Sequence, residues 1–222
     1  MPALVLIPAG GTGSRFGGEI PKQVRPLAGT PILLRVIERF FGDAEVAQII
    51  VAVPEAAIRN VKQTDRVKFV AGGATRQESV TNAFAAADDE FDVVAVHDAV
   101  RPFFKIATFH ALLDAAREHG GAFPAAPVTD TIHVVRDDML VSTPDRSMLV
   151  AAQTPQCFRP DILREVLARA REDGLDGTDE AGLAAQYGFT VRAVPGDATN
   201  FKITRPEDLV FAETHFEELS AP

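Results

Sequence analysis

The sequence ALVLIPAGGTGSRFGGEIPKQ, residues 3–23, sets the fold class of this chain. A short apolar run is followed directly by a segment with five glycines, an arginine and a lysine, and few side chains suited to a core. In an open α/β sheet, the loop after the first strand lies at the carboxyl edge, where ligands bind. Glycines there expose backbone N–H groups that can surround phosphate oxygens. The stretch therefore predicts a strand followed by an anion-binding loop.

The remainder of the chain repeats this alternation of apolar and amphipathic segments. Further apolar runs, typical of strands covered on both faces, lie at 47–53, 67–72, 92–98 and 121–128. Amphipathic segments separate them, and in residues 105–119 apolar side chains recur at helical spacing up to Gly120. We therefore predict an α/β fold with a doubly wound, mainly parallel sheet.

Two segments carry the pattern of a helix capping box. Thr75 with Glu78 precedes one amphipathic segment, and Thr204 with Glu207 precedes the last one in the chain. Such a pair satisfies free backbone N–H groups in the first helical turn. We expect a helix to begin at each place.

The α/β alternation is interrupted by residues 129–152. This segment has β-branched alternation and the turn-forming pair Asp137 and Asp138, a pattern typical of a β-hairpin. An isolated hairpin is only marginally stable in water, so we expect this arm to pack on another surface, such as a second copy of the chain. Residues 1–222 are interpreted as a single domain with the arm inserted in it.

The composition limits the classes of function. The chain has 222 residues, 46% of them hydrophobic, a formal net charge of −9 and a sequence pI near 5.0. These values are typical of one globular domain and argue against a general nucleic-acid-binding protein. No apolar run approaches the ~20 residues of a membrane span, so we expect no membrane insertion. The single cysteine, Cys157, has no disulfide or metal-ligand pattern around it, which predicts a packing role in a cytoplasmic protein.

The glycine-rich loop does not match two common phosphate-binding motifs. A P-loop would end in Gly-Lys-Ser/Thr, whereas Lys22 follows Pro21. A dinucleotide-binding motif that begins at Gly11 and Gly13 would need glycine where Phe16 stands. An ATPase and a dinucleotide-dependent enzyme are therefore disfavoured.

Two cations in this loop, Arg15 and Lys22, favour a different use of phosphate. Fixed cations beside exposed backbone amides suit a nucleoside triphosphate whose α-phosphorus is attacked, because negative charge grows on the phosphate oxygens in the transition state. The alternative is that both are solvated loop charges. Their glycine-rich surroundings favour the triphosphate-binding hypothesis.

Longer motifs connect the loop to a family. The loop PAGGTGSRFGGEIPKQ resembles the signature loop of nucleotidyltransferases that make nucleotide sugars and related diphosphates. Six later segments occur in the order typical of the 2-C-methyl-D-erythritol 4-phosphate cytidylyltransferase family: GGATRQESVTNA, VHDAVRPF, APVTDTI, TPQCF, GTDEA and NFKITRPEDL. The resemblance runs from Leu4 to Ala212, and it implies a Rossmann-like nucleotidyltransferase domain over nearly the whole chain.

The resemblance also implies a reaction. Family members transfer a cytidylyl group from CTP to 2-C-methyl-D-erythritol 4-phosphate, with Mg²⁺, and release pyrophosphate in non-mevalonate isoprenoid biosynthesis. Arg15 and Lys22 match the two catalytic cations of the family. No protein nucleophile is then needed, because the acceptor's phosphate oxygen is already anionic at neutral pH. The metal ligands are not assigned, and Asp98 is one candidate.

Further positions match binding residues of the family. Those implied for the nucleotide are Ala9, Gly10, Gly11, Gly13, Gly73, Ser79 and Asp98. Those implied for the acceptor are Asp98, Arg101, Thr131, Arg146 and Lys202. Thr131 and Arg146 lie in the arm, which in the family reaches across a two-fold axis into the neighbouring subunit, so the resemblance implies a homodimer. A local role for Ser79 and a solvated position for Arg146 stay open as alternatives.

Two positions, Gly10 and Val100, depart from the family pattern, which often has alanine at each. Gly10 would cost a little affinity through ordering entropy, and Val100 adds bulk beside Arg101. Two other functions stay open on the sequence. One is cytidylyl transfer to another polyol phosphate such as ribitol 5-phosphate, and the other is that of a non-catalytic nucleotide-binding regulator.

Overall fold

The computed structural model of the chain describes residues 2–11, 21–59, 61, 63–88 and 91–220. The strands are β1 (Ala3–Pro8), β2 (Pro26–Leu27), β3 (Thr30–Pro31), β4 (Val46–Val53), β5 (Val67–Ala71), β6 (Val93–Val96), β7 (Gly121–Pro127), β8 (Val134–Arg136), β9 (Met139–Ser142), β10 (Val150–Ala152), β11 (Gln156–Phe158) and β12 (Arg192–Pro195). The helices are α1 (Ile32–Phe41), α2 (Glu55–Ile58), α3 (Arg76–Ala85), α4 (Ile106–His119), α5 (Pro160–Glu172), α6 (Glu180–Gln186), α7 (Pro206–Thr214) and α8 (Phe216–Leu219), with 3₁₀ turns η1 (Lys22–Val24) and η2 (Arg146–Met148).

The central sheet is mixed and mostly parallel. Its strand order is β10-β7-β11-β6-β1-β4-β5, and β12 pairs with β7. Strand β1 is parallel to both β4 and β6, whereas the short strand β11 runs antiparallel between β6 and β7. The predicted α/β fold with a mainly parallel sheet is confirmed, but strand β11 was not expected from its three-residue sequence.

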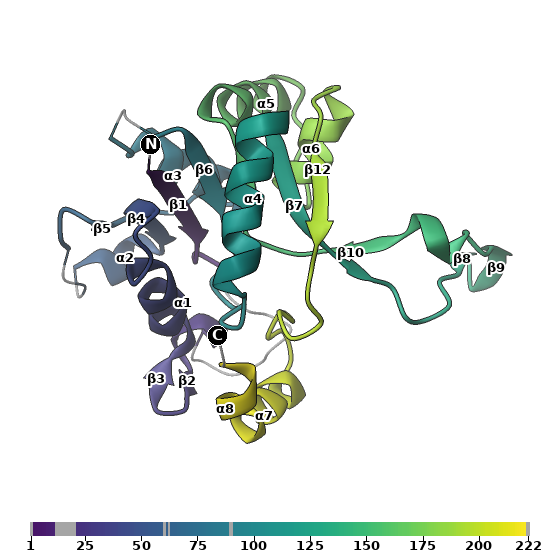
Figure 1. Cartoon of the computed structure of the whole chain (residues 1–222), viewed down its shortest axis with the longest axis horizontal. Coiled ribbons are helices and arrows are strands. Elements are labelled where there is room, and N and C mark those ends of the chain that lie inside the picture. The colour runs from purple at the N-terminus through teal and green to yellow at the C-terminus, as the bar shows by residue number, and fades with distance from the viewer. Residues whose placement is uncertain (1, 12–20, 60, 62, 89–90, 221–222) are drawn as a thin grey trace.

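Helices cover both faces of this sheet (Figure 1). Helices α1 and α4 bury apolar side chains against one face, and helices α3, α5 and α6 bury theirs against the other. The strands between them are almost fully buried, which explains their continuous apolar sequences. Cys157 lies inside this core, as its packing interpretation predicted. Within the described part of the chain, no helix has the length and apolar character needed to cross a membrane.

The two predicted helix starts have different outcomes. The Thr75 hydroxyl accepts a hydrogen bond from the Glu78 backbone N–H at 3.1 Å, so the N-cap of α3 is confirmed. The prediction for Thr204 and Glu207 is wrong by one residue. Asp208 is the acidic partner, and its carboxylate accepts from the backbone N–H groups of Thr204 and Arg205 at 2.7 and 2.8 Å. Glu207 and Asp208 are adjacent in the sequence, and the position at which the helix begins decides which carboxylate accepts from the preceding backbone N–H groups.

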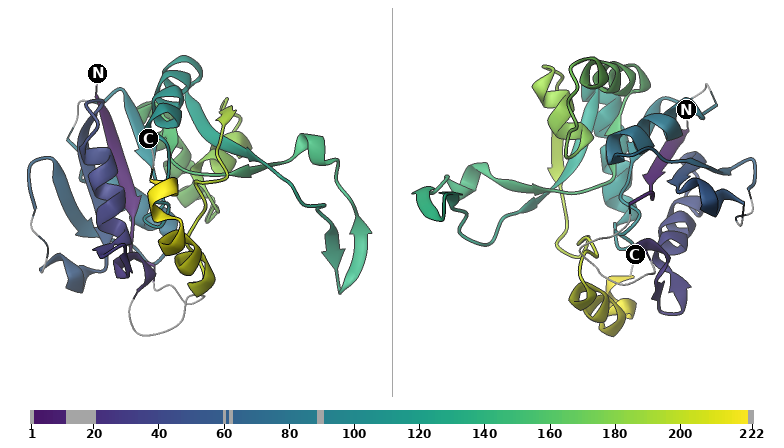
Figure 2. Two further views of the ribbon diagram at one scale, coloured as in Figure 1. Left: turned by 60° about the horizontal axis from the view of Figure 1, so that its bottom comes forward. Right: turned by 180° about the vertical axis from the view of Figure 1, so that it is seen from behind.

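The inserted arm extends away from the sheet (Figure 1; Figure 2, left). Strands β8 and β9 form its antiparallel hairpin, with Asp137 and Asp138 at positive φ of 49° and 60° in the turn. The end of the predicted segment differs from the expected hairpin, because β10 leaves the arm and joins the central sheet beside β7. The arm is therefore anchored in the domain at its base.

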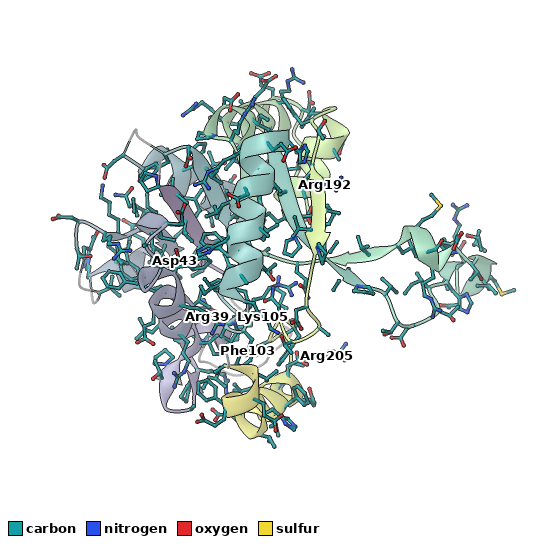
Figure 3. All side chains as sticks on the ribbon, viewed as in Figure 1. Arg39, Asp43, Phe103, Lys105, Arg192 and Arg205 are labelled. Atoms are coloured by element: carbon teal, nitrogen blue, oxygen red, sulfur yellow. The ribbon has the colours of Figure 1, made fainter. Side chains whose placement is uncertain are left out.

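The C-terminal segment closes the lower end of the domain. Phe103, which follows β6, lies beside α8 (Figure 3). Its ring packs with the rings of Phe201 and Phe216. Val100 belongs to the same apolar cluster, and its carbonyl accepts a hydrogen bond from the Ile203 backbone N–H at 3.0 Å. This packing brings the segment around Lys202 to the carboxyl end of β6.

Candidate active site

A cavity of about 190 Å³ opens at the carboxyl ends of β1 and β6. Its lining comes from five places: the turn after β1, η1, the first turn of α3 with the loop before it, the segment after β6, and the segment between β12 and α7. The sequence-predicted residues that line it are Ala9, Gly10, Gly11, Lys22, Gly73, Ser79, Asp98 and Lys202. Residues far apart in the chain thus meet at the sheet edge where ligands bind in open α/β folds.

Other predicted residues lie elsewhere. Arg15 and Gly13 are outside the described residues. Arg101 lies behind Asp98 instead of lining the cavity. Thr131 and Arg146 are exposed on the arm, where the Arg146 guanidinium donates to the Thr129 carbonyl at 2.7 Å.

Gln23 fixes the start of the glycine-rich loop relative to Lys22. Its buried amide nitrogen donates to the backbone carbonyls of Ala9 at 2.7 Å and Gly11 at 3.1 Å. Lys22 precedes it in η1 and lines the cavity. Gln23 was not among the site residues predicted from the sequence, although its position directly after Pro-Lys in the signature loop was the available signal.

Asp98 is the electrostatic centre of the cavity. Its carboxylate lies 3.0 Å from the Lys202 Nζ, 3.2 Å from the Arg101 Nε and 3.5 Å from the Arg76 Nε. Burial by itself would raise the pKa of Asp98, but the charges of these three cations lower it well below its usual range. Asp98 is therefore ionised at neutral pH, and it gathers cations from three separate segments at one point.

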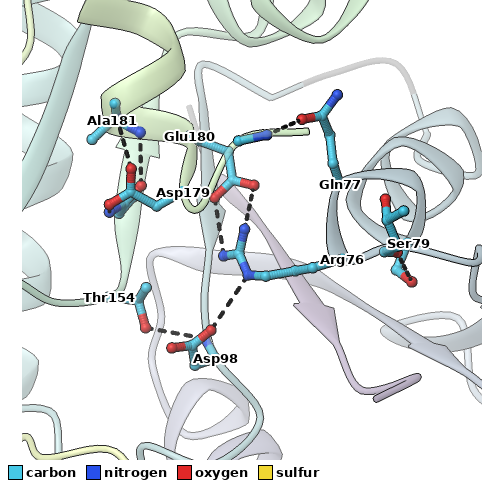
Figure 4. A network of polar contacts seen from close by, with 12 residues as sticks. Arg76, Gln77, Ser79, Asp98, Thr154, Asp179, Glu180 and Ala181 are labelled. Atoms are coloured by element: carbon cyan, nitrogen blue, oxygen red, sulfur yellow. Dashed lines mark hydrogen bonds and ion pairs between the residues drawn. The ribbon is translucent and has the colours of Figure 1, made fainter. Parts of the chain in front are cut away.

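Arg76 is a cavity residue that the sequence analysis missed (Figure 4). Its guanidinium forms two parallel hydrogen bonds, of 2.7 and 3.0 Å, with the carboxylate of Glu180, which is 1% exposed. Burial would lower the pKa of Arg76, but Glu180 and Asp98 raise it overall, so the charge is permanent. Both residues lie inside quoted motifs, GGATRQESVTNA and GTDEA, yet only the fold shows that they face each other.

Gln156 of β11 holds the start of α6, where Glu180 lies (Figure 4). Its side chain donates to the Asp179 carboxylate at 2.8 Å and accepts from the Ala181 backbone N–H at 2.9 Å. A chain of contacts thus runs from the sheet through α6 and Arg76 to Asp98.

His97 supports the loop after β6 from inside the core. Its Nε2 lies 3.0 Å from the Arg101 carbonyl and must donate to it, so Nδ1 accepts from the Thr154 hydroxyl at 3.1 Å. The Thr154 oxygen in turn accepts from the Asp98 backbone N–H at 3.0 Å. Burial lowers the pKa of His97 to about 3, so the ring is neutral. This network holds the backbone of Asp98 and Arg101.

Ser79 and Gly73 form the wall opposite the first turn after β1. The Ser79 hydroxyl donates to the Thr75 carbonyl at 2.9 Å and accepts from the Gly73 backbone N–H at 3.0 Å. A Cβ on residue 73 would overlap the Cβ of Glu78, so only glycine fits this position. The cavity therefore has a flat wall of small residues beside a cluster of cations. A doubly wound α/β fold with such a site at its carboxyl edge fits the class of nucleotidyltransferases that the glycine-rich loop predicted.

Comparison with known proteins specifies the family. The family model for IspD, 2-C-methyl-D-erythritol 4-phosphate cytidylyltransferase, matches residues 3–218. A relative of that name from Carboxydothermus hydrogenoformans is 42% identical over 219 residues, covering 96% of this chain and 94% of the relative. One from Solibacter usitatus is 38% identical and covers 100% of this chain and 98% of the relative. The chain belongs to the 2-C-methyl-D-erythritol 4-phosphate cytidylyltransferase family.

Solved structures agree with this assignment. The crystal structure of the enzyme of that name from Thermus thermophilus superposes with a TM-score of 0.81 at 36% identity, over 96% of this chain and 98% of that one. The Francisella tularensis enzyme superposes with a TM-score of 0.85 at 29% identity, over 96% and 99%. The resemblance predicted from seven sequence motifs is confirmed.

Proposed function

We propose that this chain catalyses the transfer of a cytidylyl group from CTP to 2-C-methyl-D-erythritol 4-phosphate, with release of pyrophosphate. Membership of the family indicates the reaction. The observation that supports its assignment to this cavity is the cluster of cations around Asp98, which lies beside a wall of small residues. The donor and the acceptor are both anionic, so a site that unites them needs several positive charges.

The base of CTP would lie against the small residues of the cavity. Ala9, Gly10 and Gly73 present backbone rather than bulky side chains, so a flat ring can approach closely. The Ser79 hydroxyl donates its hydrogen to the Thr75 carbonyl, which supports its local role. Its oxygen accepts from the Gly73 backbone N–H and keeps a second lone pair for a donor such as the cytosine amino group. Ser79 would then serve both the turn and the base.

The triphosphate would lie along the cationic side, with Lys22 and the sequence-assigned Arg15 as its catalytic partners. An oxygen of the acceptor's phosphate forms a bond to the α-phosphorus of CTP while the bond from that phosphorus to the β-phosphate bridging oxygen breaks. The electron pair of the broken bond leaves with pyrophosphate, and no proton must move because the attacking oxygen is already ionised. Lys22 stabilises the charge that accumulates in this transition state.

A Mg²⁺ ion would be held chiefly by the phosphates of CTP. Asp98 is the one carboxylate among the described residues that line the cavity, and the described part of the chain contains no cluster of three acidic, histidine or cysteine side chains that could hold a metal. Such a donor set fits Mg²⁺, which binds phosphate and water with one or two carboxylates. The ion would neutralise phosphate charge, and Asp98 is its candidate protein contact.

The acceptor site would be completed by a second copy of the chain. Lys202 and Asp98 line the cavity, and Arg101 orients Asp98, but Thr131 and Arg146 lie on an arm that extends away from it (Figure 1). The arm exposes large apolar side chains, including Met139 at 71% and Met148 at 82%. Such a surface suits burial against a partner. A homodimer whose arms cross would bring Arg146 and Thr131 to the partner's cavity.

The decisive experiment measures pyrophosphate release with Mg²⁺, CTP and 2-C-methyl-D-erythritol 4-phosphate. We expect turnover with this pair and little with UTP or with ribitol 5-phosphate as matched controls. Strong preference for ribitol 5-phosphate would replace the proposed acceptor. CTP binding without pyrophosphate release for any acceptor would instead indicate the non-catalytic regulator.

A further inference from the structure

Helices α3 and α5 lie on the sheet face opposite to α1 and α4 (Figure 2, right). A second cavity is lined by residues of these two helices. Its volume is about 420 Å³, and small-molecule sites occupy roughly 300–1,000 Å³. Its apolar surface is formed by Phe84, Phe91, Val94 and Leu167. None of the described residues that line it belongs to the active-site cavity, so it is a separate feature of the molecule.

Two arginines of α5 stand at this cavity. Arg164 and Arg171 are seven residues apart, which places them on one face of the helix two turns apart. The Arg164 guanidinium lies 5.4 Å from the centroid of the Phe84 ring, and this contact holds it against the cavity wall. Among the described residues, no hydrogen bond or ion pair engages the guanidinium of either arginine.

Acidic partners for arginine are plentiful in this chain, which has 31 acidic and 22 basic residues. Other arginines have paired with them: Arg76 with Glu180, Arg117 with Asp92, and Arg169, on α5 itself, with Glu165. Among the described residues, the two arginines at the cavity therefore have no carboxylate partner, although the sequence supplies an excess of acidic residues.

One carboxylate, Asp88, lies among the described residues that line the cavity, but its charge is already matched. Lys68 contacts it at 2.9 Å, and Gln48 donates to it at 2.6 Å. Arg164 and Arg171 are therefore available to bind an anion in the cavity.

We propose that this cavity binds a small amphiphilic anion, with an aliphatic or aromatic body and a carboxylate or phosphate head group. The body would be buried against Phe84 and Leu167, where removal of apolar surface from water favours binding. The head group would be held by Arg164 and Arg171, because guanidinium groups form paired, charge-assisted hydrogen bonds with carboxylates and phosphates. The occupant would lie against α3, the helix whose first turn holds Arg76 and Ser79.

Calorimetric titration of the full-length protein with decanoate and with decyl phosphate, both below micellar concentration, tests this proposal. We expect saturable binding with one of them in the presence of saturating CTP and Mg²⁺, and the tighter of the two identifies the head group. Decanol, acetate and inorganic phosphate, which each lack one half of the ligand, should bind at least tenfold more weakly. Displacement of the ligand by CTP, or no binding of either probe at millimolar concentration, would overturn the proposal.

Paired variants test the two arginines. Arg164→Gln with Arg171→Gln should weaken binding at least tenfold, whereas Arg159→Gln with Arg169→Gln removes the same charge and should change it less than twofold. Equal weakening in both would mean that only net charge matters, and the assigned site would be wrong. Ala168→Trp, which fills the cavity from an exposed position, should abolish binding independently of the charges. If the Ala168→Trp variant bound the probe as tightly as the unchanged protein, the proposed site would be wrong.

Discussion

The active-site cavity and the arm place their charged residues in opposite ways. Around the cavity, Asp98 and Glu180 are buried and both contact Arg76, which comes from a different segment of the same chain. On the arm, Arg146 is exposed and hydrogen-bonds only locally to the Thr129 carbonyl among the described residues. In the proposed site, one half is thus built by the fold of a single chain, and the other half would come from the arm of a second copy. Substitutions should therefore act differently in the two regions.

Substitution in the buried ion pair of Arg76 and Glu180 should have the largest effect on stability. Glu180→Ala leaves the Arg76 guanidinium without its bidentate partner, which should lower the free energy of unfolding by about 3–5 kcal/mol. Glu165→Ala removes the exposed partner of Arg169 on α5 and should cost less than about 1 kcal/mol. Chemical denaturation of both variants measures the difference. Equal losses would show that burial does not distinguish these pairs.

Lys22→Ala tests the cationic side of the cavity. Loss of one preorganised contact to the transition state should lower turnover by roughly 10²-fold, with the fold intact. Arg15→Ala is expected to behave alike on the basis of the sequence. Lys68→Ala, which removes a lysine outside the cavity, is the control for pyrophosphate release and should keep normal turnover. Unchanged turnover in the Lys22 variant would contradict its catalytic role.

The buried His97 should make the domain acid-sensitive. Burial holds the folded-state pKa of His97 to about 3, whereas the unfolded chain titrates near the ordinary value of 6.5. The unfolded state therefore binds more protons between these values, so this stability is complete above pH 6.5 and is lost as the pH falls toward 3.

Chemical denaturation between pH 6.5 and 4.5 measures how the free energy of unfolding changes as His97 titrates in the unfolded chain. Asp98 stays ionised in the folded protein over this pH range, because its pKa is lowered. We expect a slope of about 1 kcal/mol per pH unit. The slope should flatten in His97→Asn and persist in His133→Asn, which changes an exposed histidine of the arm. An unaltered slope in the His97 variant would rule out this residue as the source.

Arg146→Ala tests the arm. If the arm completes a partner's acceptor site, the KM for 2-C-methyl-D-erythritol 4-phosphate should rise about tenfold, because one charge-assisted hydrogen bond to the acceptor would be lost. Calorimetric CTP binding should stay nearly unchanged. Arg136→Ala, an exposed arginine on the same arm, provides the matched control. An equal loss of CTP affinity would place Arg146 outside the acceptor site.

The smallest effect is expected for Gly10→Ala. A Cβ at Gly10 would lie 3.5 Å from the Ser79 Oγ, an ordinary contact, so alanine fits and should stabilise the fold by about 0.4–1 kcal/mol through the unfolded state. CTP should then bind slightly more tightly. Gly73→Ala, where the new Cβ would overlap Glu78, should instead destabilise the protein. Thermal denaturation compares the two glycines, and a destabilised Gly10 variant would contradict the expected fit.

The sequence predicted the fold class and much of the cavity because the relevant signals are local. Continuous apolar runs indicate buried strands, and glycines after the first of them indicate a ligand-binding turn. Strand β11 was missed because three residues carry no periodicity of their own. The second predicted capping box was displaced to Asp208 because neighbouring acidic residues look equivalent until the helix register is known.

The partners within the site could not be predicted. Arg76 and Glu180 are 104 residues apart, and nothing in either segment specifies the other. Gln23 and Thr154 likewise act on backbone groups brought to them by the sheet. Such contacts depend on the superposition of distant segments, which local propensity does not encode.

The amino-acid order alone determined that this chain is an α/β nucleotidyltransferase with cations in its first loop, because periodicity and motifs are properties of neighbouring residues. Only the tertiary structure decided that Asp98 collects three cations, that Glu180 anchors Arg76 and that the arm's Arg146 stands apart from its own cavity. The physical reason is that charge pairing and burial act through space, and the distances that set them exist only once the sheet has brought its edges together.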